Sequence, residues 1–215
     1  MHARIKELFD YLDVRREELR AAVESVPEDK REVQPAPDRW SVAGVIEHLA
    51  LLETRLTGLF RKRIAEGRAA GVGLDTETSP VIAPADIDLL LDRTRRLVAP
   101  ETIHPKRETD AASAWRALEQ AREGFRAMIL DADGLALNEI VHPHLVFGPM
   151  DLYQWIAFVG GHEARHAAQI REIGGQLAAS SASQTSPASL AAPAHRHGRA
   201  ARPVSVRWCR TCGRD

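Results

Sequence analysis

Four long amphipathic stretches limit what this chain can fold into. In residues 1–177, apolar side chains recur at spacings of three and four, which places them on one face of an α-helix. The stretches begin near residues 5, 42, 111 and 152, and we find neither a useful alternating strand pattern nor an internal repeat. The pattern predicts an all-α fold, a four-helix bundle with a long crossover between the second and third helices.

Capping residues indicate where three of these helices begin. Ser41 and Asp110 each precede an apolar stripe, and their side-chain oxygens can accept hydrogen bonds from orphan backbone N–H groups. Asp151 and Gln154 have the spacing of a capping box at the start of the last helix. Gly174-Gly175 is expected to end that helix, since glycine is the usual C-terminal stop.

Two segments between the helices interrupt the periodicity. Glycines and prolines punctuate residues 67–110, which predicts the long crossover, with a short helix expected at residues 86–98. Residues 142–149 contain two histidines and two prolines just before the last helix, and we expect a structured loop there.

The residues after Leu177 differ from the helical part in composition and charge. The whole chain has a formal net charge of −1, but six arginines and one aspartate give residues 178–215 a charge of +5. This low-complexity segment has too little apolar surface to offset its ordering entropy, so we expect a disordered tail. It ends in the pair Cys209 and Cys212, which suits half a zinc ribbon, a redox pair or, as we favour, an incidental pair. The chain therefore divides into a helical domain, 1–177, and a basic tail, 178–215.

Composition also excludes several classes of protein. No run of about 18 apolar residues is present, so no membrane partner is expected. The charged first residues lack the apolar segment of a secretory signal. Both cysteines lie in the tail, so the helical domain does not depend on disulfides, which is consistent with a cytoplasmic protein. The helical domain is acidic, which makes nucleic acid an unexpected partner.

Two histidines in the middle of the last apolar stripe are the strongest candidates for chemistry. His162 and His166 are four residues apart, so both rings project from the core face of the predicted helix. Buried imidazoles need partners, because unpaired buried polar groups are costly, and a shared divalent metal is the simplest common partner. His48, at the edge of the second helix's stripe, can supply a third nitrogen. Three protein ligands with one open position are typical of a catalytic metal site.

Three further residues near these histidines are weaker candidates. Glu163 can act as a base or orienter beside a ligand histidine, or form an ion pair with an arginine on a neighbouring helix. His144, in the loop before the last helix, can border the mouth of the site and contact substrate or supply a fourth ligand. Gln169 lies one turn beyond His166 on the same side and is a similar cofactor-binding candidate.

Four features occur in a characteristic order, namely Trp40-Ser41 at the start of the second helix, His48, the loop at Phe147-Gly148 and His162-x-x-x-His166. In these features residues 1 to about 177 resemble the DinB-like superfamily of metal-binding four-helix bundles. It implies a divalent metal, commonly zinc or nickel, held by the three matching histidines and completed by water. The family is often homodimeric and includes bacillithiol transferases and mycothiol-dependent maleylpyruvate isomerases.

The resemblance implies a hydrolase or a low-molecular-weight-thiol S-transferase that acts on a small-molecule substrate, with the thiol as a further cofactor. A bound metal would lower the pKa of a water or thiol, which makes hydroxide or thiolate available near neutral pH.

Two other functions stay open at this point. One is a non-catalytic, metal-binding, dimeric stress-response protein. The other is a zinc protease, because His162-Glu163-x-x-His166 matches H-E-x-x-H, with Glu163 as the base. The extended metzincin pattern would need glycine at position 169 and histidine at 172, where this chain has Gln169 and Glu172. No glutamate follows Leu177 to act as a later ligand, so the sequence disfavours the protease.

Overall fold

The structure is a computed structural model, and it describes residues 1–82, 100–106 and 108–185. The chain divides into two units, Met1–Gln184 and Thr185–Asp215. The short helix expected at residues 86–98 lies outside the described residues, and so does the part of the expected disordered tail that follows residue 185.

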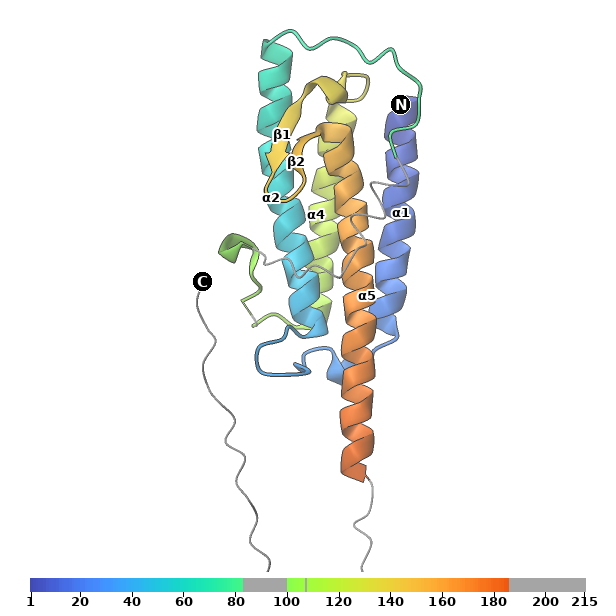
Figure 1. The fold of residues 1–215 in the computed structure, drawn as a ribbon, viewed down its shortest axis with the longest axis vertical. Coiled ribbons are helices and arrows are strands. Elements are labelled where there is room, and N and C mark those ends of the chain that lie inside the picture. Colours follow the sequence, from blue (N-terminus) through green and yellow to red (C-terminus); the bar gives the residue numbers. More distant parts are fainter. Residues whose placement is uncertain (83–99, 107, 186–215) are drawn as a thin grey trace, which may run out of the picture. The chain divides into compact units, whose positions relative to one another are not determined.

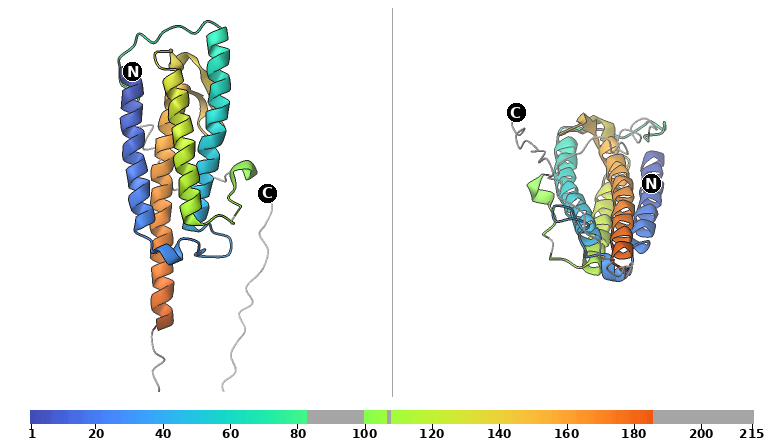
Figure 2. Two further views of the ribbon diagram at one scale, coloured as in Figure 1. Left: turned by 180° about the vertical axis from the view of Figure 1, so that it is seen from behind. Right: turned by 60° about the horizontal axis from the view of Figure 1, so that its bottom comes forward.

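Four long helices run side by side in the first unit (Figure 1), and the view from behind shows the same arrangement (Figure 2). They are α1 (Ala3–Glu24), α2 (Val42–Ala69), α4 (Ala111–Asp131) and α5 (Leu152–Thr185). Short 3₁₀ helices lie between them, at η1 (Glu28–Lys30), η2 (Glu101–Ile103) and η3 (Leu137–Glu139). The predicted all-α bundle and the long crossover, which here joins α2 to α4, are confirmed.

The predicted helix caps are present in the structure. The Ser41 hydroxyl accepts a hydrogen bond from the Gly44 N–H at 3.1 Å, and the Asp110 carboxylate accepts one from the Ser113 N–H at 2.8 Å. Asp151 and Gln154 form the reciprocal pair, in which each side chain accepts from the other residue's N–H, at 2.9 and 3.0 Å. These contacts satisfy N–H groups that the helices cannot satisfy internally.

The prediction that the last helix ends at Gly174-Gly175 is wrong, because α5 continues to Thr185 and so includes residues 178–185 of the expected disordered tail. A Cβ at position 174 would lie 2.9 Å from Val26 Cγ2, so the absence of a side chain there permits a close approach to Val26. Ile173 and Leu177 are buried on either side of the glycines, and this packing holds the helix through them. Tertiary packing here overrides the weak helix propensity of glycine, which costs about 1 kcal/mol per residue.

The loop expected at residues 142–149 is instead a β-hairpin. Strand β1 (Val141–His144) pairs antiparallel with β2 (Gly148–Asp151), and His144 lies opposite Gly148. Gly148 adopts a φ of +75°, which a residue with a side chain rarely tolerates. The strands are four residues long and each contains a proline, so neither carries the alternating pattern of a strand.

Apolar side chains of the bundle form two separate core clusters. One cluster, which includes Leu12, Leu56 and Phe125, lies toward the hairpin, and the other, which includes Leu19 and Leu118, lies toward the opposite end. Each is built from all four long helices. Within the described part of the chain, no helix combines the length and apolarity needed to cross a membrane.

Candidate metal centre

Three histidines from two helices meet in the seam between α2 and α5. His48 on α2 and His162 and His166 on α5 each offer a nitrogen, and these atoms all lie within 4.8 Å of one another. The Nε2 atoms of His162 and His166 are 3.2 Å apart. The ring of His48 lies 5.3 Å from that of His162 and 5.0 Å from that of His166. The structure therefore brings together the three residues that the sequence predicts as metal ligands.

Hydrogen bonds at the second ring nitrogen fix the tautomers of two of these histidines. Nδ1 of His48 lies 2.8 Å from the carbonyl oxygen of Ile103, and Nδ1 of His166 lies 2.8 Å from Oε1 of Gln169. Both oxygens can only accept, so each Nδ1 carries the proton and each Nε2 keeps its lone pair. Metal-bound histidines typically make this kind of contact. Gln169, a predicted cofactor-binding residue, thus contacts His166.

His162 is the most exposed of the three, although one of its nitrogens is buried. Its Nδ1 is buried and has no hydrogen-bond partner among the described residues. Burial, together with the charges that His166 and His48 would carry, lowers the pKa of His162 well below its ordinary value. Burial likewise lowers the pKa of His48. Both rings are therefore neutral at physiological pH, which is the form that binds metal.

The donor set fits a divalent transition metal. Three neutral imidazoles without a thiolate suit zinc, nickel, copper or iron, while magnesium and calcium prefer oxygen ligands. The unpartnered Nδ1 of His162 indicates a polar partner that none of the described residues supplies.

Aromatic rings line one side of the histidine cluster. Phe158 stacks on His162 with ring centres 5.3 Å apart, and His144 lies 4.9 Å from both Phe158 and Trp155. The hairpin therefore brings His144 near the site, as the sequence suggests. However, Nδ1 of His144 accepts from the backbone N–H groups of residues 146 and 147, at 3.0 and 3.2 Å, so only its Nε2 is available for other contacts.

Glu163 is buried, and its carboxylate contacts arginines of two neighbouring helices. Its Oε1 lies 2.7 Å from Nη2 of Arg16 on α1 and 3.0 Å from Nη2 of Arg122 on α4. These are ion pairs with arginines of neighbouring helices, one of the two roles that the sequence leaves open. A zincin base would need its carboxylate beside the metal-bound water.

Residues 100–106 supply a contact that sequence reasoning does not anticipate. Their Ile103 carbonyl orients His48, and the Lys106 N–H holds the segment to α2 through Oε2 of Glu47, at 3.1 Å. Trp40 packs its ring 4.8 Å from that of His48. A backbone carbonyl leaves no side-chain signal, and only the bracketing Pro100 and Pro105 hint at a constrained segment.

Comparison with known proteins agrees with this geometry. The model of the DinB superfamily matches residues 11–170, a range that contains all three histidines. The chain is 25% identical over 152 residues to "Uncharacterized protein YuaE" of Bacillus subtilis (strain 168), and the alignment covers 70% of this chain and 87% of that protein. No solved structure matches the chain significantly.

Proposed function

Because the chain belongs to the DinB superfamily, we propose that it is a metal-dependent enzyme, either a hydrolase or a low-molecular-weight-thiol S-transferase. The observation that carries this proposal is the meeting of three imidazoles, two of which have their tautomers set by Ile103 and Gln169. Three nitrogens from two helices leave room for a water or a substrate atom at the metal, as catalytic sites require.

Each residue around the proposed metal has a distinct role. His48, His162 and His166 would hold the ion, which is zinc or nickel in this proposal. When bound, it supplies Lewis acidity that makes a water or a thiol more acidic. The Ile103 carbonyl and Gln169 keep two ligand rings in the metal-binding tautomer. Phe158 covers one face of His162 and keeps bulk water from it.

The thiol-transfer version of the proposal also implies the source of the thiol and the compartment in which the protein works. As the family resemblance implies, the thiol would be a separate small molecule and a small electrophile its acceptor. Low-molecular-weight thiols stay reduced in the cytoplasm, where we place the protein. We also carry over the homodimeric state from the family resemblance.

Metal analysis tests the proposal most directly. The purified protein is expected to contain about one divalent metal per chain, as measured by elemental analysis, since one three-histidine site is proposed. His162→Ala should lose that metal while its circular dichroism remains helical. A metal-free wild type, or equal metal in wild type and variant, would refute the site.

Activity assays then separate the alternatives. The metal-loaded protein is assayed with a panel of thiols and electrophilic acceptors, and with esters and amides. Metal-dependent turnover supports the enzyme, whereas an inert holo-protein favours the non-catalytic dimeric binding protein. Casein cleavage that Glu163→Gln abolishes would restore the protease, although Oε1 of Glu163 already forms ion pairs with two arginines.

A further inference from the structure

A buried layer of four charged residues crosses the bundle between its two apolar clusters. The layer takes one residue from each long helix, namely Arg16, Glu53, Arg122 and Glu163. None of them is more than 7% exposed. We call this set the ion layer.

Shared hydrogen bonds join the ion layer into one unit. Arg122 contacts Glu53 through Nε at 2.5 Å and Nη2 at 3.4 Å, and the same Nη2 lies 3.0 Å from Oε1 of Glu163. Arg16 contacts Glu163 through Nε at 2.9 Å and Nη2 at 2.7 Å, and Glu53 at 3.4 Å. Each arginine therefore holds both carboxylates, and each carboxylate holds both arginines.

Stability alone does not account for the ion layer. Removing two arginines and two carboxylates from water carries a large desolvation cost, and well-packed apolar residues in place of buried ion pairs are often neutral or stabilising. The best attested benefit of buried charges is that they fix one register among otherwise similar apolar packings. The helices of this bundle present apolar residues on both sides of the layer, so the layer specifies their axial alignment.

The two carboxylates lie on the two helices that carry the histidines. Glu163 directly follows His162 on α5, and Glu53 lies five residues after His48 on α2. Five residues of helix span about 7.5 Å along its axis. The arginines come from α1 and α4, which carry none of the three histidines. Arg16 and Arg122 thus brace α2 against α5 close to the metal centre without being part of it.

The metal centre is sensitive to the relative placement of α2 and α5. Zinc–nitrogen bonds of 2.0–2.1 Å in a tetrahedral site place ligand nitrogens about 3.3 Å apart. His162 and His166 share one helix and already have this spacing, at 3.2 Å. His48 comes from the other helix, so its nitrogen keeps its place only if α2 and α5 keep their offset.

We propose that Arg122 and Arg16 are positioning residues, which hold Glu53 and Glu163 so that His48 meets His162 and His166 at metal-binding distance. This proposal deepens the proposed function and rests on it. Neither arginine is itself a metal ligand. Both act through α2 and α5, the helices that carry the ligand histidines.

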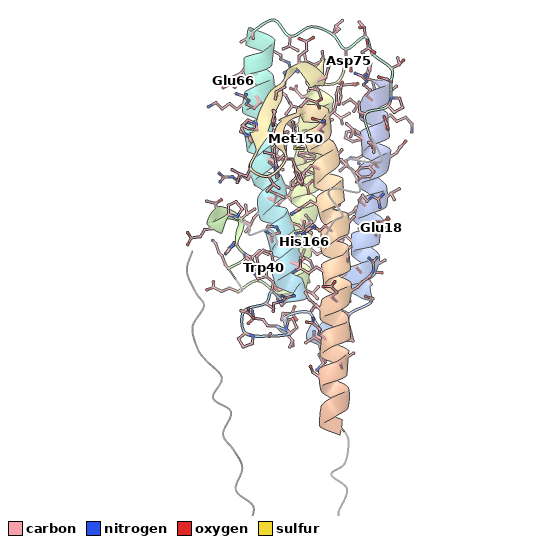
Figure 3. The ribbon with its side chains drawn as sticks, in the orientation of Figure 1. Glu18, Trp40, Glu66, Asp75, Met150 and His166 are labelled. Carbon is pink, nitrogen blue, oxygen red and sulfur yellow. The ribbon has the colours of Figure 1, made fainter. Side chains whose placement is uncertain are left out.

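Cobalt(II) binding to the full chain tests the proposal with two matched variants. Arg122→Lys keeps the charge of the ion layer but loses the planar fork that reaches both carboxylates. Arg4→Lys makes the same change at a buried arginine outside the ion layer, which contacts Asp75 at 3.2 Å. Figure 3 shows Asp75 near the end of the bundle where α1 begins, and His166 in the other half. Affinity is measured by competition with a chromophoric chelator, well below the melting temperature of each variant, and the cobalt d–d absorption reports coordination geometry.

We expect Arg122→Lys to bind cobalt(II) about 10–100-fold more weakly than wild type, a loss as large as that caused by removing a ligand's own hydrogen-bond partner, with an altered d–d spectrum. Arg4→Lys should lower the melting temperature but keep wild-type affinity and spectrum. Glu53→Asp keeps the charge and shortens the reach, and it serves as the second variant if Arg122→Lys does not fold. Wild-type affinity in a folded Arg122→Lys or Glu53→Asp, or equal losses in Arg4→Lys, would overturn the positioning role alone. A wild type that binds no cobalt would overturn the metal site itself.

Discussion

Glu163→Leu should destabilise the bundle far more than a double variant that removes Glu163 and Arg16 together. In the wild type the four charges of the ion layer cancel, and Oε1 of Glu163 contacts both arginines. The single variant leaves two buried guanidinium groups to share Glu53, and the contact of Arg16 with that carboxylate is 3.4 Å long. One uncompensated positive charge then remains in the core.

The expected magnitude follows from that charge imbalance. Removing one partner of a buried ion pair typically costs about 3–5 kcal/mol of unfolding free energy. For a domain of 150–250 residues, 1 kcal/mol lowers the melting temperature by about 2–4 °C, so the single variant should melt about 6–20 °C below wild type. Glu163→Leu/Arg16→Leu restores neutrality, since Arg122 and Glu53 keep their 2.5 Å contact. It should therefore recover at least half of the loss.

Urea unfolding followed by circular dichroism checks this prediction on the metal-free protein. A chelator is needed because a metal that binds only the folded state adds to the apparent stability. Wild type, both single variants and the double variant form a cycle, and we expect a coupling energy of at least about 3 kcal/mol between positions 16 and 163, the upper end of the usual range for residues in contact. Additive single effects, or a Glu163→Leu variant within about 1 kcal/mol of wild type, would show that this layer does not behave as a buried, charge-balanced unit.

Three further predictions address other parts of the molecule. Gln169→Ala should weaken zinc binding by about 10-fold or more in a chelator competition while one zinc per chain still binds, because His166 loses the acceptor of its Nδ1 proton. Burial alone would raise the pKa of Asp75, but hydrogen bonds from Tyr153 and the Glu77 N–H and the charge of Arg4 lower it overall. The stabilisation from this carboxylate is therefore present above its unfolded pKa of about 3.9 and is lost as the pH falls through the lower folded value, so the stability gap between wild type and Asp75→Asn should shrink below about pH 4. Gly160→Ala places a Cβ in steric clash with the Tyr11 ring and should cost about 1–3 kcal/mol in urea unfolding, whereas Gly124→Ala, which meets nothing within 4 Å, should not destabilise.

The helices and their starting points are predictable from sequence because their causes are local. A spacing of three and four residues reports the buried face, and Ser41, Asp110 and Asp151 act on N–H groups two or three residues away. The end of α5 and the hairpin depend on distant partners instead. Gly174 continues the helix because it lies against Val26, and the short proline-containing strands pair only because the chain turns at Gly148.

In the candidate site, too, some contacts follow from local sequence and others depend on tertiary packing. His162 and His166 share one helical face, so their proximity follows from the sequence alone. That His48 joins them depends on how α2 packs against α5, and the sequence supports it through the family resemblance. The Ile103 carbonyl is a backbone group, 55 positions from His48, and no pattern of side chains could have indicated it.

Helical periodicity identifies the four residues of the ion layer as core positions, although a search for apolar side chains alone does not find them. Arg16, Glu53 and Arg122 each lie four residues after one buried leucine and three before another buried apolar residue, at Leu12 and Leu19, Leu49 and Leu56, and Leu118 and Phe125. Glu163 is likewise four residues after the buried Val159 and four before the buried Ala167. Each position belongs to the core face, and a charge there is costly unless it is paired. Each of the four helices carries one such charge, and two are positive and two negative. The sequence therefore predicts that the four side chains pair with one another, and this pairing fixes the axial alignment of the helices. In the positioning proposal, the same alignment also keeps His48 within reach of His162 and His166, whose ligand atoms lie within 4.8 Å of one another.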